Sequence, residues 1–208
     1  MSNTLEHELS AGVDALGLKL PPHVIQQQLN FIGLLQQWNA SYNLTAVRDI
    51  NEMVSKHLLD SLSVLPYLGE GDVIDVGAGA GLPGIPLALA RPEQAFTLID
   101  TVGKKTRFMT QAKIKLGLGN ITVVNARVEN HRRDGGYDVV ISRAYASTDD
   151  FIASTRHLHH KGSRVLVMQG KVDEALSHDD YHIQQVFEIL VPGLDAQRHL
   201  LEIIPACR

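Results

Sequence analysis

The sequence predicts an α/β fold in which a seven-stranded, mainly parallel sheet ends in an antiparallel hairpin and follows a cap of N-terminal helices. Helical patterns without a strand fill the first 66 residues, and short apolar runs then alternate with helical patterns. The last two apolar runs are joined by the turn signal Pro192-Gly193-Leu194-Asp195, and so short a connection favours an antiparallel pair. We therefore expect a helical extension over residues 1–66, packed on an α/β core over residues 67–208.

The extension is expected to contain three helices, each with apolar residues at helical spacing. The first runs up to Gly17, and its apolar residues are Leu5, Leu9, Val13 and Leu16. The second opens at Pro21-Pro22 and has an apolar face of Phe31, Leu34, Leu35 and Trp38. The third starts after Asp49, with Glu52 as its capping partner, and ends at Pro66.

The core is expected to alternate strands with helices. Strands are predicted over residues 73–76, 96–99, 121–124, 139–141, 164–168, 183–190 and 199–204. Helices are predicted over residues 85–90, 104–116, 149–158 and 173–177.

A glycine-rich loop follows the first predicted strand, and Gly77 and Gly79 would let the backbone approach a ligand closely. The pattern Asp75-x-Gly77-x-Gly79-x-Gly81 is typical of S-adenosylmethionine-dependent methyltransferases, whereas Gly79-x-Gly81-x-x-Gly84 fits the dinucleotide fingerprint. The apolar run ends just before Gly77, and counted from there the third glycine of the dinucleotide pattern is missing. A dinucleotide domain also has no need of the final hairpin. A plain glycine-rich turn is the remaining alternative.

Polar residues at the ends of the next strands suit an adenosine cofactor. Asp100 ends the second strand about 20 residues after the loop, where a carboxylate can accept both ribose hydroxyls. It can equally cap the helix that follows. Residues 126–129 follow the third strand, where a loop would meet the adenine, although Glu129 there could be merely solvated.

Arg143 directly follows a buried apolar run, at the strand edge where ligands gather in open parallel sheets. An arginine there is costly unless it is paired or near water, so we interpret it as a site residue; an ion pair with Asp75 or Asp100 is the alternative. Tyr145 lies at the same edge, and Lys171 follows the fifth strand.

A polar, aromatic-flanked connector over residues 38–45 includes Tyr42 and Asn43 and is expected beside the glycine loop. Ordinary turn chemistry explains it equally well. His57 and Asp60 share one helical face and could pair or contact a substrate. Without a third ligand they make a poor metal site, and no metal motif is found.

The net charge of −4 excludes a global nucleic-acid signature, so RNA binding would need a local patch. Candidate phosphate contacts are Lys104, Lys105, Arg107, Lys113, Lys115, Arg127, Arg132 and Arg133. A solvated helix face is an equally good explanation for any one of them. The single cysteine, Cys207, and the absence of a long apolar run predict a cytoplasmic protein without a membrane segment, and a monomer is expected.

Four motifs together resemble the bacterial glucose-inhibited division protein B family. They are Asn39 with Asn43-Leu44-Thr45, His57 with Asp60-Ser61, Asp75-Val76-Gly77-Ala78-Gly79-Ala80-Gly81-Leu82-Pro83-Gly84-Ile85-Pro86, and Ile141-Ser142-Arg143-Ala144. The resemblance runs from Trp38 to about Ile204. It departs at Gln169, where many relatives carry a lysine before the glycine.

The resemblance implies a Rossmann-like class I S-adenosylmethionine-dependent methyltransferase that modifies ring nitrogen 7 of one guanosine in 16S ribosomal RNA of the small subunit. It implies cofactor contacts at Gly77, Leu82, Asp100, Val128, Glu129 and Arg143. Nitrogen 7 carries a free lone pair and no proton, so no general base is expected and catalysis would rest on positioning. Candidate substrate contacts are Tyr42, Asn43, His57, Tyr145 and Lys171, with Arg143 as the candidate catalytic residue.

Three alternatives remain open at this point. A methyltransferase of the same fold could act on a protein or small molecule, which the acidic net charge favours. A non-catalytic ribosome-assembly or nucleotide-sensing module would bind the cofactor without turnover. An NAD enzyme is the most distant alternative.

Overall fold

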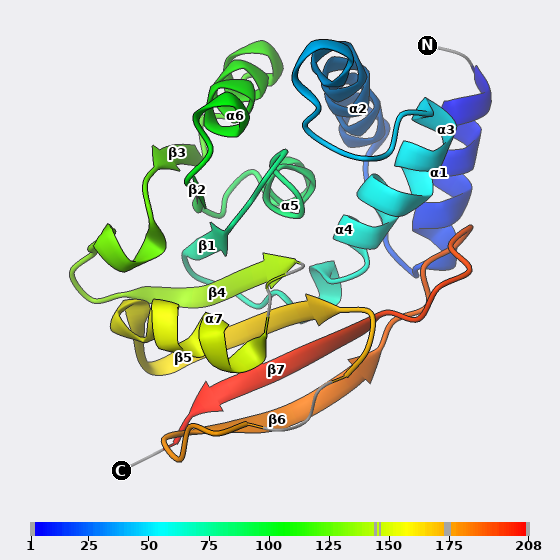
Figure 1. Cartoon of the computed structure of the whole chain (residues 1–208). Helices are drawn as coiled ribbons and strands as arrows, with labels where there is room; N and C mark the ends of the chain where they lie inside the picture. Colours follow the sequence, from blue (N-terminus) through cyan, green and yellow to red (C-terminus); the bar gives the residue numbers. More distant parts are fainter. Residues whose placement is uncertain (1–2, 144, 146, 173–175, 207–208) are drawn as a thin grey trace.

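The computed structural model describes residues 3–143, 145, 147–172 and 176–206, and a seven-stranded sheet forms its centre (Figure 1). The strands are β1 Val73–Val76, β2 Phe96–Asp100, β3 Ile121–Asn125, β4 Tyr137–Arg143, β5 His159–Gln169, β6 Tyr181–Glu188 and β7 His199–Pro205. Their order is β3-β2-β1-β4-β5-β7-β6. The pairs among β1 to β5 are parallel, whereas β7 is antiparallel to both β5 and β6. The predicted sheet with its antiparallel hairpin is confirmed.

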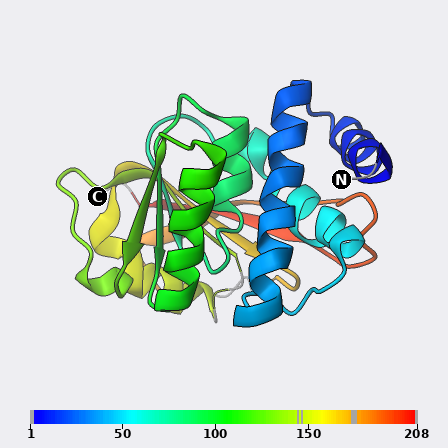
Figure 2. The same ribbon diagram turned by 90° about the horizontal axis from the view of Figure 1, so that it is seen from above.

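Helices cover both faces of the sheet (Figure 2). The helical elements are α1 Asn3–Ala15, α2 Pro22–Tyr42, α3 Ile50–Met53, a π-helical segment η1 Val54–Leu59, α4 Asp60–Leu62, α5 Gly84–Ala90, α6 Gly103–Leu116 and α7 Thr148–Thr155. Short 3₁₀ turns occupy η2 Leu65–Tyr67, η3 Val128–Asn130 and η4 Arg156–Leu158.

Alternating side chains of each strand point to opposite faces and so build two cores. Val73 belongs to a large cluster that includes the N-terminal helices, α5 and α6, whereas Ile74 belongs to a second cluster with Phe151 of α7. Leu9 and Phe31 are fully buried in the first cluster. The N-terminal helices and the sheet therefore share a hydrophobic core.

The helical predictions for the first third need three corrections. The second helix does not end near Trp38 but continues to Tyr42, so most of the predicted connector is its last turn. The third helix is interrupted by η1, and all of residues 54–62 except Lys56 are buried, so this segment has no single apolar face. Asp49 does cap it, by accepting from Asn51 N at 2.9 Å, but Glu52 pairs with Lys56 at 2.8 Å.

Two predictions in the C-terminal half also differ from the structure. β5 begins at His159, five residues before the predicted 164, because His159 pairs with Tyr137 of β4 ahead of an irregularity in the register. The helix predicted over residues 173–177 falls mainly on residues outside the described ones, and the described Leu176 and Ser177 are not helical.

The connection between β6 and β7 positions part of the site. β7 starts beside the end of β5, since Gln169 pairs with His199. The segment before β7 therefore lies at the carboxyl edge of the parallel strands.

Among the described residues, no helix is both long and apolar enough to cross a bilayer.

Candidate active site

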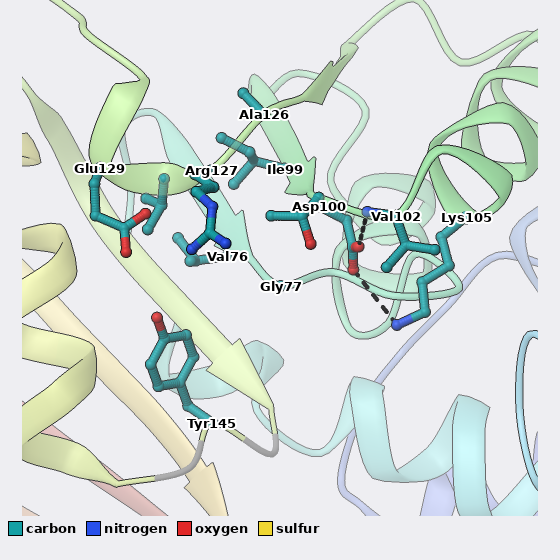
Figure 3. A pocket seen from close by; sticks show the side chains of 12 residues that line it. Val76, Gly77, Ile99, Asp100, Val102, Lys105, Ala126, Arg127, Glu129 and Tyr145 are labelled. Carbon is teal, nitrogen blue, oxygen red and sulfur yellow. Dashed lines mark hydrogen bonds and ion pairs between the residues drawn. The ribbon is translucent and has the colours of Figure 1, made fainter.

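A first pocket, of about 320 Å³, lies at the carboxyl ends of β1 and β2 (Figure 3). We call it the glycine-loop pocket. It is lined by Val76, Gly77, Ile99, Asp100, Thr101, Val102, Lys105, Ala126, Arg127, Val128, Glu129 and Tyr145. Four of the predicted cofactor residues thus share one cavity, and they come from three successive strand ends.

The loop glycines have different physical roles. Gly77 has a φ of +70°, and a Cβ built there meets no atom within 4 Å, so its open side is available to a ligand. A Cβ at Gly84 would instead lie 2.1 Å from Leu98 Cδ2, and one at Gly81 would lie 2.4 Å from Ile85 Cδ1. Gly81 and Gly84 are therefore needed for packing, whereas Gly77 leaves space beside the pocket.

The Asp100 carboxylate holds the loop and the next helix together. Its Oδ2 accepts from Gly79 N at 2.9 Å and lies 3.7 Å from Lys105 Nζ, while Oδ1 accepts from Val102 N at 2.8 Å. Figure 3 shows the contacts of Asp100 with Val102 and Lys105 beside the cavity. α6 begins at Gly103, so Asp100 orients the turn before the helix and also lines the pocket.

Asp75 is buried behind the same loop. Its Oδ2 accepts from Gly84 N at 2.8 Å, and its Oδ1 has no partner among the described residues. Burial is the main cause that raises the pKa of Asp75 to about 7. Between pH 3.8 and about 7 the Asp75 carboxyl is therefore mainly protonated in the folded protein and mainly ionised in the unfolded chain.

This shift predicts a pH-dependent difference between the wild type and Asp75→Asn. A carboxyl whose folded-state pKa is raised stabilises the fold below its unfolded pKa of 3.8, and this contribution is lost as pH rises through about 7. Denaturant unfolding should show the wild-type free energy of unfolding falling by up to about 4 kcal/mol relative to Asp75→Asn across that range. A constant difference would contradict the shift.

A second pocket, of about 800 Å³, opens beside the first, and Tyr145 lines both. We call it the arginine pocket. It is lined by Val47, Lys56, His57, Asp60, Arg143, Tyr145, Met168, Gln169, Gly170, Lys171, Leu194, Asp195, Ala196 and Arg198. Four cationic side chains and two carboxylates line the wall of this pocket, so the net charge of the wall is positive.

Asp60 joins two arginines at this wall. Arg143 Nη1 donates to Asp60 Oδ2 at 2.9 Å, and Arg198 Nε donates to Asp60 Oδ1 at 2.9 Å. Asp60 is 2% exposed. The alternative of an ion pair between Arg143 and Asp75 or Asp100 is therefore wrong, because Asp60 takes that place. Sequence reasoning missed Arg198, although it directly precedes the strand predicted over residues 199–204.

His57 is a neutral, fixed part of the same wall. Its Nδ1 donates to the carbonyl of Lys56 at 2.9 Å, and its Nε2 lies 2.9 Å from Thr45 Oγ1, which donates to it. Burial, helped by the charge of Arg143, lowers the pKa of His57 to about 4. His57 and Asp60 do not bond to each other among the contacts of the described residues, so the predicted pairing of the two is replaced by separate partners.

Several other predicted site residues lie outside both pockets. Gly79 donates to Asp100 from its backbone, and Leu82 is 4% exposed within the first core. Tyr42 and Asn43 end α2, and neither lines a pocket described above. Lys171 does line the arginine pocket. Contacts of these residues with cofactor or substrate stay predictions.

The candidate phosphate contacts are scattered. Arg127 lines the glycine-loop pocket. Arg133 forms an ion pair with Asp72, which directly precedes β1 and so lies at the opposite end of the strands. Arg132 donates to the carbonyl of His131 at 2.9 Å. Within residues 3–143, 145, 147–172 and 176–206, no group of three or more His, Cys, Asp or Glu side chains could hold a metal ion.

Comparison with known proteins places the chain in a family. A family model described as rRNA small subunit methyltransferase G matches residues 24–201. The chain belongs to this family. It is 47% identical over 208 residues to "Ribosomal RNA small subunit methyltransferase G" of Pseudomonas aeruginosa strain LESB58, with 97% of each chain covered. The protein of that name from Ectopseudomonas mendocina strain ymp is 48% identical, with 97% of each chain covered.

Solved structures agree on the fold. A SAM-dependent methyltransferase from Aquifex aeolicus matches with a TM-score of 0.56 and 18% identity, over 71% of this chain and 90% of that one. A putative methyltransferase from Thermoplasma acidophilum matches with a TM-score of 0.54 and 17% identity, over 66% and 69%. The predicted methyltransferase fold class is confirmed.

Hydrogen bonds join two of the polar motifs behind the wall of the arginine pocket. Asn39 Oδ1 accepts from Thr45 N at 2.9 Å, and Asn39 Nδ2 donates to the carbonyl of Val47 at 3.0 Å. Thr45 in turn holds His57. In this member of the family, Asn39 and Thr45 therefore fix the shape of the wall, since neither of them lines the pocket.

Proposed function

We propose that this protein transfers a methyl group from S-adenosylmethionine to ring nitrogen 7 of a guanosine in 16S ribosomal RNA of the small subunit. The observation that carries the proposal is the pair of adjoining pockets. One pocket has a glycine loop and a buried acid at the strand ends, the other has four cations, and Tyr145 lies on the wall of both. A nucleoside cofactor and an anionic acceptor can therefore meet there.

The glycine-loop pocket suits S-adenosylmethionine. Its volume of about 320 Å³ lies within the usual range for small-molecule sites, about 300 to 1,000 Å³. Asp100 would accept the ribose hydroxyls, and the apolar Ile99 and Val128 would flank the adenine. The open space at Gly77 would admit the cofactor's close approach. When bound, S-adenosylmethionine supplies an electrophilic sulfonium methyl group.

The acceptor chemistry needs little from side chains. Guanine nitrogen 7 has a free lone pair and loses no proton on methylation, so no general base is required. The arginine pocket offers neutral His57 and a guanidinium pair fixed by Asp60. We infer that Arg143 and Arg198 position the guanosine, a contribution that can reach effective molarities of about 10⁵ to 10⁸ M.

An RNA acceptor agrees with the local charge. The whole chain has a net charge of −4, yet Lys56, Arg143, Lys171 and Arg198 gather on one pocket wall. The related proteins carry the name ribosomal RNA small subunit methyltransferase. The target base would have to be unpaired or displaced to enter the pocket. We expect the protein to act as a monomer in the cytoplasm.

Transfer of a labelled methyl group to small ribosomal subunits tests the proposal. The subunits are purified from cells that lack this gene, and RNA and protein are separated after the reaction. We expect label in the RNA fraction only. Label in protein would favour a protein acceptor, and no label despite bound cofactor would favour a non-catalytic module.

A further inference from the structure

An aromatic pair, half-buried Trp38 and exposed Tyr42, lies at the end of α2, outside both pockets. Trp38 and Tyr42 stack with ring centroids 5.1 Å apart and planes at 30°. Tyr42 is 42% exposed, which makes it one of the few large apolar side chains left open among the described residues. Because the Tyr42 ring already stacks on Trp38, holding it in place costs little further conformational entropy when a ligand binds. Its open face can therefore stack on another flat group.

Positive charge surrounds this pair. Lys104 Nζ donates to the carbonyl of Tyr42 at 2.7 Å, and Arg48 Nη2 donates to Asn43 Oδ1 at 2.8 Å. Arg107 and Trp38 together line a groove of about 300 Å³. In the part of the chain that the structure describes, Arg48, Lys104 and Arg107 form no ion pair. We call Trp38, Tyr42, Arg48, Lys104 and Arg107 the aromatic patch.

The aromatic patch adjoins both pockets. Lys104 reaches Tyr42, whereas its neighbour Lys105 lines the glycine-loop pocket beside Asp100. From Tyr42 the chain runs only five residues to Val47, which lines the arginine pocket. Residues 43–47 are held by the hydrogen bonds of Asn39, described above. The patch is therefore a fixed neighbour of the site and not a detached surface.

We propose that the aromatic patch binds a nucleotide next to the target guanosine in the RNA strand, with its base on Tyr42 and its phosphate near Lys104 and Arg107. Stacking of unpaired bases on aromatic side chains, with cations along the backbone, is how single-stranded RNA is held. An acidic peptide could bind the cations of the aromatic patch, but it would offer no flat group to stack on the exposed Tyr42 ring. The inference rests on the proposed RNA substrate.

Steady-state kinetics with small ribosomal subunits test the patch. Tyr42→Leu removes the ring and keeps an apolar side chain, whereas Tyr42→Phe keeps the ring. For Tyr42→Leu we expect the KM for subunits to rise about 5- to 150-fold, with kcat and the Kd for S-adenosylmethionine unchanged. Tyr42→Phe should behave as the wild type. Ile114→Ala, an exposed apolar position at the other end of α6, is the matched control.

The charge is tested separately. Lys104→Ala should reduce the slope of log affinity against log salt concentration by about 1, because one phosphate contact is lost. Lys19→Ala, three residues before α2 begins and so at the opposite end of that helix from Tyr42, should leave the slope unchanged. An unchanged KM in Tyr42→Leu, or an unchanged slope in Lys104→Ala, would overturn the proposal. Methylation by the wild type, measured in the same assay, separates such a failure from a failure of the proposed function.

Discussion

Replacing Gly77 with valine is expected to abolish S-adenosylmethionine binding while the fold remains. The position of a Cβ at Gly77 is free of protein atoms, so the added side chain would occupy the space that the cofactor needs. The φ of +70° also disfavours a β-branched residue, at a cost of about 1 to 2 kcal/mol. That cost alone is small against a typical stability of about 5 to 15 kcal/mol. Calorimetric titration measures the binding.

Gly17 provides a closely matched control for this substitution. It has a φ of +69°, nothing lies within 4 Å of its Cβ position, and it follows α1 far from either pocket. Gly17→Val should cost the same stability and keep full cofactor affinity. If both variants bind S-adenosylmethionine equally well, the assignment of the glycine loop to the cofactor is wrong.

Arg143→Ala and Asp60→Asn are each expected to lower methyl transfer about 100-fold or more, since a misplacement of about 1 Å can cost that much. Arg143 lines the arginine pocket and not the glycine-loop pocket, so the Kd for S-adenosylmethionine should change little. Asp60 acts through the guanidinium groups of Arg143 and Arg198. The double variant should therefore lose less activity than the product of the two single losses.

Glu202→Gln is the control that separates the positioning role of Asp60 from the loss of stability expected when any buried ion pair is removed. Glu202 is 8% exposed and pairs with Arg164 at 2.6 Å, on β7 and β5 and outside both pockets. Its removal should lower the melting temperature and leave kcat near the wild-type value. Full activity of Asp60→Asn, or losses that multiply in the double variant, would show that Asp60 does not position the arginines.

Apolar periodicity and turn residues were sufficient to predict the sheet, because its central strands, such as β1 and β4, bury short runs of β-formers. They could not show the early start of β5, where His159 pairs with Tyr137 through main-chain contacts and not through apolar burial. Nor could they reveal η1. A spacing pattern identifies a helix by one apolar face, and Ser55, His57 and Asp60 are buried as well.

Site residues that directly follow a predicted strand could be placed from the sequence. Contacts between residues far apart in the chain could not. Asp100 and Arg143 stand at the ends of predicted strands, so their edge of the sheet followed from the sequence. The pairing of Asp60 with Arg198 joins residues 138 positions apart and depends on how the segment before β7 returns to α4. The antiparallel direction of β7 could have indicated this pairing. A strand antiparallel to β5 begins at the carboxyl edge of the parallel strands, and Arg198 directly precedes it.

Identification of the methylated nucleoside is the direct test of guanosine methylation by this protein. Small subunits from cells lacking the gene are incubated with labelled S-adenosylmethionine and the wild-type protein, and their 16S RNA is digested and separated by mass spectrometry. We expect label in 7-methylguanosine, from one position of the RNA. Label in any other nucleoside, or in none while the cofactor is shown to bind, would contradict it.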